Sequence, residues 1–128
     1  MMKFKTMMII KAVVCLIFGP TLLLAPGLLA DLYGISFGPG GQFFANLYGA
    51  SMIGVLLLCW LAREVDPSAV RTAITWDLVV YDAIGLIVAL LYQLQGGMNA
   101  LGWSIAAIYL FLTLGFGYFL ISGPAYER

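Results

Sequence analysis

Four long apolar runs divide the 128-residue chain and restrict the folds open to it. A helix rises 1.5 Å per residue, so about 20 apolar residues span the hydrocarbon core of a bilayer. Only 9% of the residues are charged and 63% are hydrophobic, whereas soluble domains carry about 25% charged residues. We therefore predict an all-α fold, an integral membrane antiparallel four-helix bundle that forms a single domain over residues 1–128. Its spans are expected at about 7–25, 43–62, 70–92 and 101–121.

The first run also has features of a signal peptide, because Lys3 and Lys5 precede it and small residues follow it. Lys11 interrupts its apolar stretch, which favours a retained helix. The connection 26–41 begins with leucines and ends with glycines, and we expect a short interfacial or partly re-entrant turn there. Its glycines lack the GK[ST] ending of a phosphate-binding loop and indicate turns instead.

The basic residues gather on one side of the predicted bundle. They are Lys3, Lys5, Lys11, Arg63, Arg71 and Arg128. Cytoplasmic loops of membrane proteins are enriched in lysine and arginine. This rule predicts a multi-pass protein of the inner (cytoplasmic) cell membrane, with both termini in the cytoplasm and the lipid bilayer as its first partner.

Several classes of chemistry find no support in the residue types present. The chain contains no histidine, the commonest general base and metal ligand. Cys15 and Cys59 lie in different apolar runs without metal-binding spacing and are expected as buried thiols. We expect no catalytic residue, no metal and no cofactor, and enzymatic activity is not indicated. The chain has no basic stripe of the kind that binds nucleic acid, so nucleic acid is not expected as a partner.

Asp77 and Asp82 lie inside the run 70–92. An ionisable group at membrane depth is costly in free energy, so its presence calls for an explanation. Counted from Arg71, Asp77 is about 9 Å deep and Asp82 about 16 Å deep. Lys11 has a depth similar to that of Asp77, so a structural ion pair between Lys11 and Asp77 is one expectation. The alternative is that both side chains reach the nearby headgroups.

Asp82 lies near the predicted midplane, and no charged partner is expected at its depth. Three roles are open to it. It is a neutral, hydrogen-bonded packing residue, or a residue that lines a polar cavity, or a proton carrier in a transport cycle. The candidate ligand or proton site consists of Asp82 with Tyr81, Asn46, Tyr48 and Tyr109.

Small residues recur at four-residue spacing in two of the runs. Ala45 precedes Gly49, and Gly85 precedes Ala89. Such pairs allow helices to approach closely, within one chain or between chains. A membrane-protein partner or a homo-oligomer is therefore expected.

The four-span plan, with LYG at 32–34 and LYGA at 47–50, resembles the small DoxX-like membrane proteins and related families of unknown function. The resemblance covers the architecture over most of the chain. DoxX proteins are associated with quinone-linked sulfur oxidation, so the resemblance implies a membrane oxidoreductase subunit. No functional residue is carried over from it.

Three functions are consistent with these features. The first is a small non-catalytic membrane protein, either an accessory or scaffold subunit or a binder of an apolar ligand within the bundle. The alternative is a proton-coupled carrier of a small hydrophobic molecule, with Asp82 as the proton site. The third is the DoxX-like oxidoreductase subunit.

Overall fold

The structure is a computed structural model that describes residues 3–126, with only the backbone described for residues 123–126. This part of the chain is all-α, as predicted, and contains no strand. Its helices are α1 (Phe4–Leu24), α2 (Pro26–Tyr33), α3 (Pro39–Leu61), α4 (Ala69–Leu94) and α5 (Gly102–Tyr126). By length and composition, the four longer helices can each cross a membrane.

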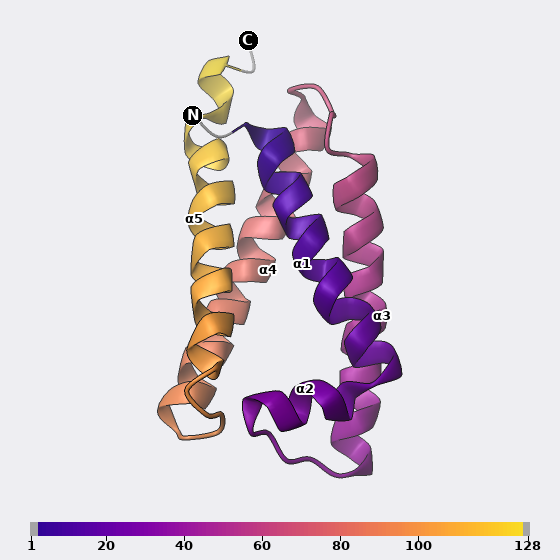
Figure 1. Ribbon diagram of the computed structural model, residues 1–128. Coiled ribbons are helices and arrows are strands. Elements are labelled where there is room, and N and C mark those ends of the chain that lie inside the picture. The colour runs from indigo at the N-terminus through magenta and orange to yellow at the C-terminus, as the bar shows by residue number, and fades with distance from the viewer. Residues whose placement is uncertain (1–2, 127–128) are drawn as a thin grey trace.

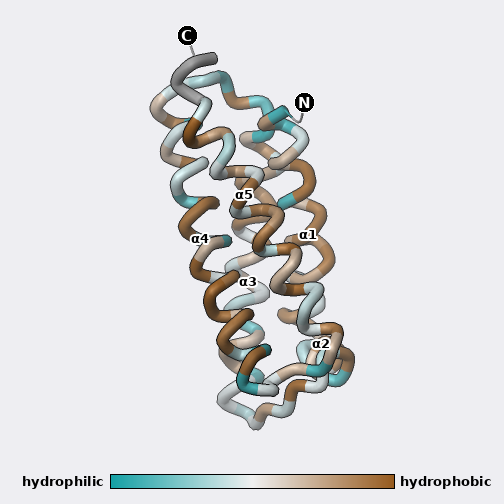
Figure 2. Tube along the Cα trace, turned by 90° about the vertical axis from the view of Figure 1, so that its left-hand side faces the viewer, coloured by the Kyte–Doolittle hydropathy of each residue, from teal (hydrophilic) through white to brown (hydrophobic). Residues whose placement is uncertain are grey.

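The four long helices alternate in direction along the bundle (Figure 1). α1 packs along α3, and α4 packs along α5, while α1 also touches α5. The molecule is therefore two antiparallel helix pairs, α1–α3 and α4–α5. Figure 2 shows apolar residues along the middle of the helices and polar residues at the loops of both ends.

Close packing of α1 on α3 depends on a glycine. A Cβ atom added to Gly49 would lie 2.5 Å from the backbone nitrogen of Leu23 and 2.6 Å from the carbonyl oxygen of Gly19. These distances are too short for any side chain, so the two backbones are in direct contact here. The prediction of close helix approach at Gly49 is confirmed.

The short helix α2 replaces the turn predicted for the connection 26–41. Pro26 is its first residue, and Gly34 follows it with a φ of +71°. Proline suits the first helical position, and glycine suits the left-handed position after the last turn. The backbone N–H of Asn99, in the α4–α5 loop, donates to the carbonyl of Tyr33, and its side chain donates to the carbonyl of Leu32.

Two helix ends differ from their predicted positions. α3 begins at Pro39, not at residue 43, because proline is favourable at the first position of a helix. α5 continues through Gly123 and Pro124 to Tyr126, beyond the predicted end at residue 121.

The apolar core occupies the half of the bundle near the start of α1. The buried residues of this core cluster are Phe4, Met7, Met8, Ala12, Cys59, Leu78, Leu112, Phe116 and Phe119. Within this cluster the ring of Phe4 packs edge-on against Phe116 and Phe119. The other half of the bundle, next to α2, is less completely filled.

Candidate functional site

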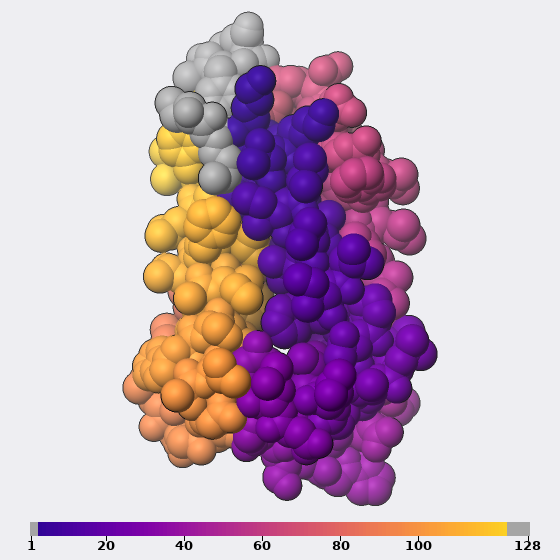
Figure 3. Space-filling view, viewed as in Figure 1, coloured from indigo at the N-terminus to yellow at the C-terminus, as the bar shows by residue number. Residues whose placement is uncertain are grey.

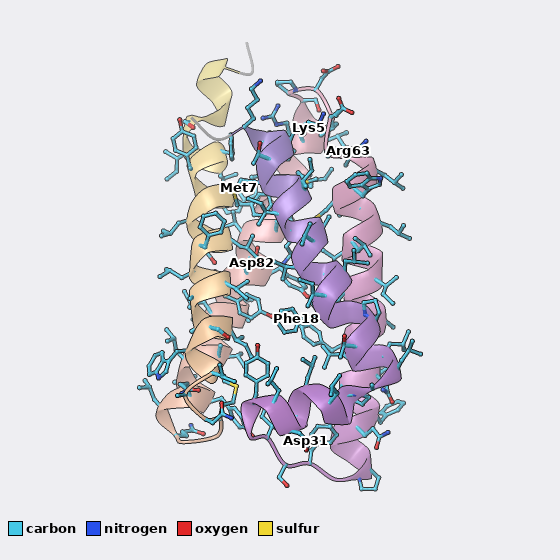
Figure 4. The ribbon with its side chains drawn as sticks, in the orientation of Figure 1. Lys5, Met7, Phe18, Asp31, Arg63 and Asp82 are labelled. Carbon is cyan, nitrogen blue, oxygen red and sulfur yellow. The ribbon has the colours of Figure 1, made fainter. Side chains whose placement is uncertain are left out.

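A cavity of about 420 Å³ lies between α1, α2, α3 and α5. Figure 3 shows a hollow in the surface where α1, α2 and α5 meet. The walls are mainly apolar and include Val14, Leu29, Ala45 and Ile108. Phe18 also lines the cavity, and in Figure 4 its ring points into the space above α2. The cavity is therefore an apolar chamber between the helices that opens at the surface of the bundle.

The direction of α1 explains why this space exists. α1 starts beside α5, where Phe4 reaches Phe116 and Phe119, and it ends beside α3, away from α5 (Figure 1). α2 then closes the widened end, with Ala30 and Tyr33 buried. A tilted helix and a short closing helix thus create the chamber.

A second cavity, of about 610 Å³, is lined largely by α4 with parts of α3 and α5. Its walls include Tyr81, Gly85 and Val88, and the two cavities share Tyr48 and Tyr109 among their lining residues. The cavities therefore adjoin at these two tyrosines.

Three tyrosine hydroxyls meet between the cavities. Those of Tyr48 and Tyr109 are hydrogen-bonded to each other, and the Tyr81 hydroxyl donates to that of Tyr48 over 3.3 Å. They come from α3, α5 and α4, so the hydroxyls connect the two helix pairs. Gly85 makes room for the Tyr109 ring, since a Cβ atom there would lie 2.7 Å from its Cζ.

A buried ion pair forms the second connection between the helix pairs. The Lys11 Nζ lies 2.5 Å from Asp82 Oδ1, and the two side chains are 1% and 0% exposed. The same ammonium lies 4.2 Å from the centre of the Tyr81 ring. Asp82 Oδ2 has no hydrogen-bond partner among the described residues. Figure 4 shows Asp82 directed into the interior from α4.

This geometry corrects the predicted partner of Lys11, which is Asp82 and not Asp77. It also corrects the prediction that Asp82 has no charged partner at its depth. Asp77 and Asp82 are five positions apart, about 140° around a helix. Asp82 shares the inward face of α4 with Leu78, whereas Asp77 is exposed on the outside. The face of the helix decides the pairing, and the depth counted along the axis does not.

The buried residues of α1 explain why Lys11 points inward. They follow one stripe at intervals of three and four: Phe4, Met7, Met8, Lys11, Ala12, Cys15 and Gly19. Hydropathy along the sequence does not show this stripe, because the other residues around Lys11 are apolar on every face. Because Lys11 belongs to this stripe, its side chain points toward α4.

Asn46 has a different role from the one predicted. Its Nδ2 donates to the carbonyl oxygens of Leu22 and Leu23, each at 3.0 Å. These carbonyls belong to the last turn of α1, which has no helical partners for them. Asn46 lines neither cavity and instead fastens α3 to the end of α1.

Of the candidate site residues, the structure therefore brings Tyr48, Tyr81 and Tyr109 together at the cavities, whereas Asp82 is not among the lining residues of either cavity. The sequence analysis missed the contribution of α2 to the first cavity. The spacing of Pro26 and Gly34, a helix start and a helix stop, was the signal available for it. Among the described residues, no cluster of three or more histidine, cysteine, aspartate or glutamate side chains could hold a metal ion.

Comparison with known proteins gave no match to a family model, a curated protein or a solved structure. The resemblance to DoxX-like proteins therefore stays a prediction.

Proposed function

We propose that the protein is an integral membrane protein that binds an apolar small molecule inside its helix bundle. The observation that carries this proposal is the chamber of about 420 Å³ between α1, α2, α3 and α5. Sites for small molecules usually have volumes of about 300–1,000 Å³, apolar walls and a few polar groups. The chamber has these properties, with the hydroxyls of Tyr48 and Tyr109 on its wall.

The outer surface supports a membrane location. Large apolar side chains are exposed along all four long helices, among them Leu16, Leu57, Ile87 and Leu114. A soluble monomer rarely exposes apolar patches of more than a few hundred Å². In a bilayer these side chains contact lipid.

The charges at the two ends support the predicted orientation in the inner (cytoplasmic) membrane. Figure 4 shows Lys5 and Arg63 at the end where α1 begins and Asp31 at the opposite end. Under the positive-inside rule, the end with Lys5 and Arg63 faces the cytoplasm. Arg128, which also enters this prediction, lies outside the described residues.

A binding role has more support than the proton-coupled carrier. Asp82, the proposed proton site of a carrier, is fully buried, paired with Lys11 and absent from the walls of both cavities. The cavity walls are instead apolar, with few polar groups. Such a chamber suits retention of an apolar molecule that partitions into the bilayer.

A cavity-filling variant tests the binding role. Ala45 lines the chamber, whereas Ala50, on the same helix, is exposed on the outside. We expect Ala45→Phe to weaken binding of an apolar fluorescent probe at least about tenfold, because the new ring occupies the space of the ligand. The measurement is a titration of purified protein in detergent, together with mass spectrometry of solvent extracts for a co-purified molecule.

Ala50→Phe is the matched control and should leave the titration unchanged. Absence of probe binding by the unaltered protein, with no apolar molecule in its extracts, would count against the proposal. Equal loss of binding in both variants would also count against it, because the effect would then be independent of the chamber.

A further inference from the structure

The wall of the first cavity carries few polar groups, and most of them are already engaged. The Lys11 ammonium is bound by Asp82 and lies over the Tyr81 ring, and neither of these residues lines this cavity. The Tyr33 hydroxyl is 3.4 Å from the Ser104 hydroxyl near α2. The hydroxyls of Tyr48 and Tyr109 remain as the polar groups on the wall.

A count of hydrogens shows that one donor is left over. Tyr81, Tyr48 and Tyr109 have three hydroxyl hydrogens in total, one on each side chain. Their two mutual hydrogen bonds use two of these hydrogens. Since Tyr81 donates to Tyr48, the third hydrogen belongs to Tyr48 or Tyr109. No other described residue is seen to accept it.

The position of this spare donor connects it to a ligand. Both Tyr48 and Tyr109 line the two adjoining cavities, and Tyr48 is 38% exposed, so a spare hydroxyl hydrogen of this pair is accessible to a molecule held in either cavity. An acceptor supplied by a bound molecule would satisfy it. Since Asp82 already balances the charge of Lys11, the site favours a neutral acceptor over an anion.

We infer that the ligand is an elongated apolar molecule with a neutral carbonyl group, such as a ketone or an ester, that accepts a hydrogen bond from the Tyr48–Tyr109 pair. Its apolar chain extends from the tyrosines past Phe18 and Leu29 toward α2. This inference rests on the proposed binding function and specifies the chemical class of the ligand.

The test compares two probes of equal chain length, 2-tridecanone and tridecane, as competitors of the apolar fluorescent probe. One net hydrogen bond corresponds to about a 2- to 13-fold difference in dissociation constant. The ratio of the tridecane dissociation constant to the 2-tridecanone dissociation constant measures the preference for the ketone. We expect this ratio to be about tenfold larger in the unaltered protein than in the double variant Tyr48→Phe/Tyr109→Phe. In the infrared spectrum, the carbonyl band of bound 13C-labelled 2-tridecanone should lie at lower wavenumber in the unaltered protein than in the double variant.

Tyr81→Phe is the matched control. It removes a hydroxyl from the same cluster but leaves Tyr48 and Tyr109 with one shared bond and one spare hydrogen, so the ketone preference should persist. Tridecane binding by the double variant checks that its chamber is intact.

Two results would overturn the inference. One is equal binding of both probes by the unaltered protein. The other is a ketone preference that survives in the double variant. If tridecane still binds in either case, the proposed function stands without the inference, whereas failure of both probes to bind the unaltered protein removes both.

Discussion

At the scale of residues, the Lys11–Asp82 pair places two charges inside the bundle, with side chains that are 1% and 0% exposed. Removing a charge from water costs several kcal/mol, and an opposite charge at hydrogen-bond distance offsets much of this cost. In the interior of a membrane protein, each charge depends on the other, because no solvent is available as a substitute. The pair therefore links α1 to α4 through their side chains and holds the Lys11 ammonium over the Tyr81 ring.

Removing one partner of this pair should destabilise the fold more than removing both. We expect Lys11→Met or Asp82→Leu alone to lower the free energy of unfolding by about 3–5 kcal/mol, since each leaves an uncompensated buried charge. The double variant should recover most of that loss. Reversible unfolding in mixed detergent micelles measures the three values.

Asp77→Asn serves as the control, because Asp77 is exposed on the outside of α4 away from the pair, and the substitution keeps a polar group there; such a surface substitution changes stability by about 0.5 kcal/mol or less. A double variant as unstable as the sum of the single variants would show that Lys11 and Asp82 do not depend on each other.

The sequence analysis grouped Tyr48, Tyr81 and Tyr109 with Asp82 and Asn46 as candidate site residues, but it assigned Lys11 to the wrong aspartate. Polar residues inside apolar runs are visible without a structure, and Tyr48, Tyr81 and Tyr109 were found in this way. The orientation of Lys11 was hidden because α1 is apolar on every face, so its inward stripe has no hydropathy signal. Depth along the helix axis was then the remaining basis for choosing the partner of Lys11, and it favoured Asp77.

At the scale of helices, Gly49 sets the distance between α1 and α3. Its missing side chain lets α3 contact the backbone of Leu23 and Gly19 directly. Packing in membrane proteins relies on such close contacts, because lipid tails compete equally for apolar surface. This packing positions Ala45, one turn before Gly49, and Tyr48, directly before it, against the cavity.

Adding one methyl group at Gly49 should force α1 and α3 apart. We expect Gly49→Ala to lower the free energy of unfolding by about 1–3 kcal/mol, the usual cost of overpacking against an unyielding neighbour. Gly54→Ala, on the same helix, meets no atom within 4 Å and should leave stability unchanged or slightly raised. The two variants are compared in the same unfolding assay. Similar losses in both would mean that the contact of Gly49 with α1 does not govern the result, because the gain in helix propensity from Gly→Ala is the same at both positions.

The long helices were predictable from apolar length alone, and their boundaries fell within a few residues of the structure except at the start of α3 and the end of α5. α2 was not predicted, because its eight residues are too few to show a helical period. Its contribution to the chamber also depends on the hydrogen bonds of Asn99 to Tyr33 and Leu32. Such contacts between distant segments leave no local pattern in the sequence.

At the scale of the whole molecule, the two helix pairs are packed tightly at one end and separated by cavities at the other. The core around Phe4 and Phe116 closes the end where α1 begins. The other end is spanned by α2 and its contacts with the α4–α5 loop. Under the proposed orientation, the closed end lies toward the cytoplasm and the chamber lies in the outer half of the bilayer.

Labelling of single introduced cysteines tests that orientation. Ser36 lies in the connection before α3, and Asp66 lies in the loop before α4, at opposite ends of the bundle; both are exposed. We expect a membrane-impermeant maleimide to label Ser36→Cys in intact cells and Asp66→Cys only after the membrane is opened. The native Cys15 and Cys59 are buried and should give a low background. Labelling of Asp66→Cys alone in intact cells would reverse the assigned orientation.

The Lys11–Asp82 pair also joins residues that the ribosome adds 71 positions apart. Under the proposed membrane location, α1 and α3 enter the bilayer with a cation whose counter-charge has not yet been synthesised. The carboxylate of Asp82 on α4 therefore completes the charge balance of α1. A chain cut short before α4 carries an unmatched lysine in its interior, which distinguishes an unfinished molecule from a finished one during biogenesis.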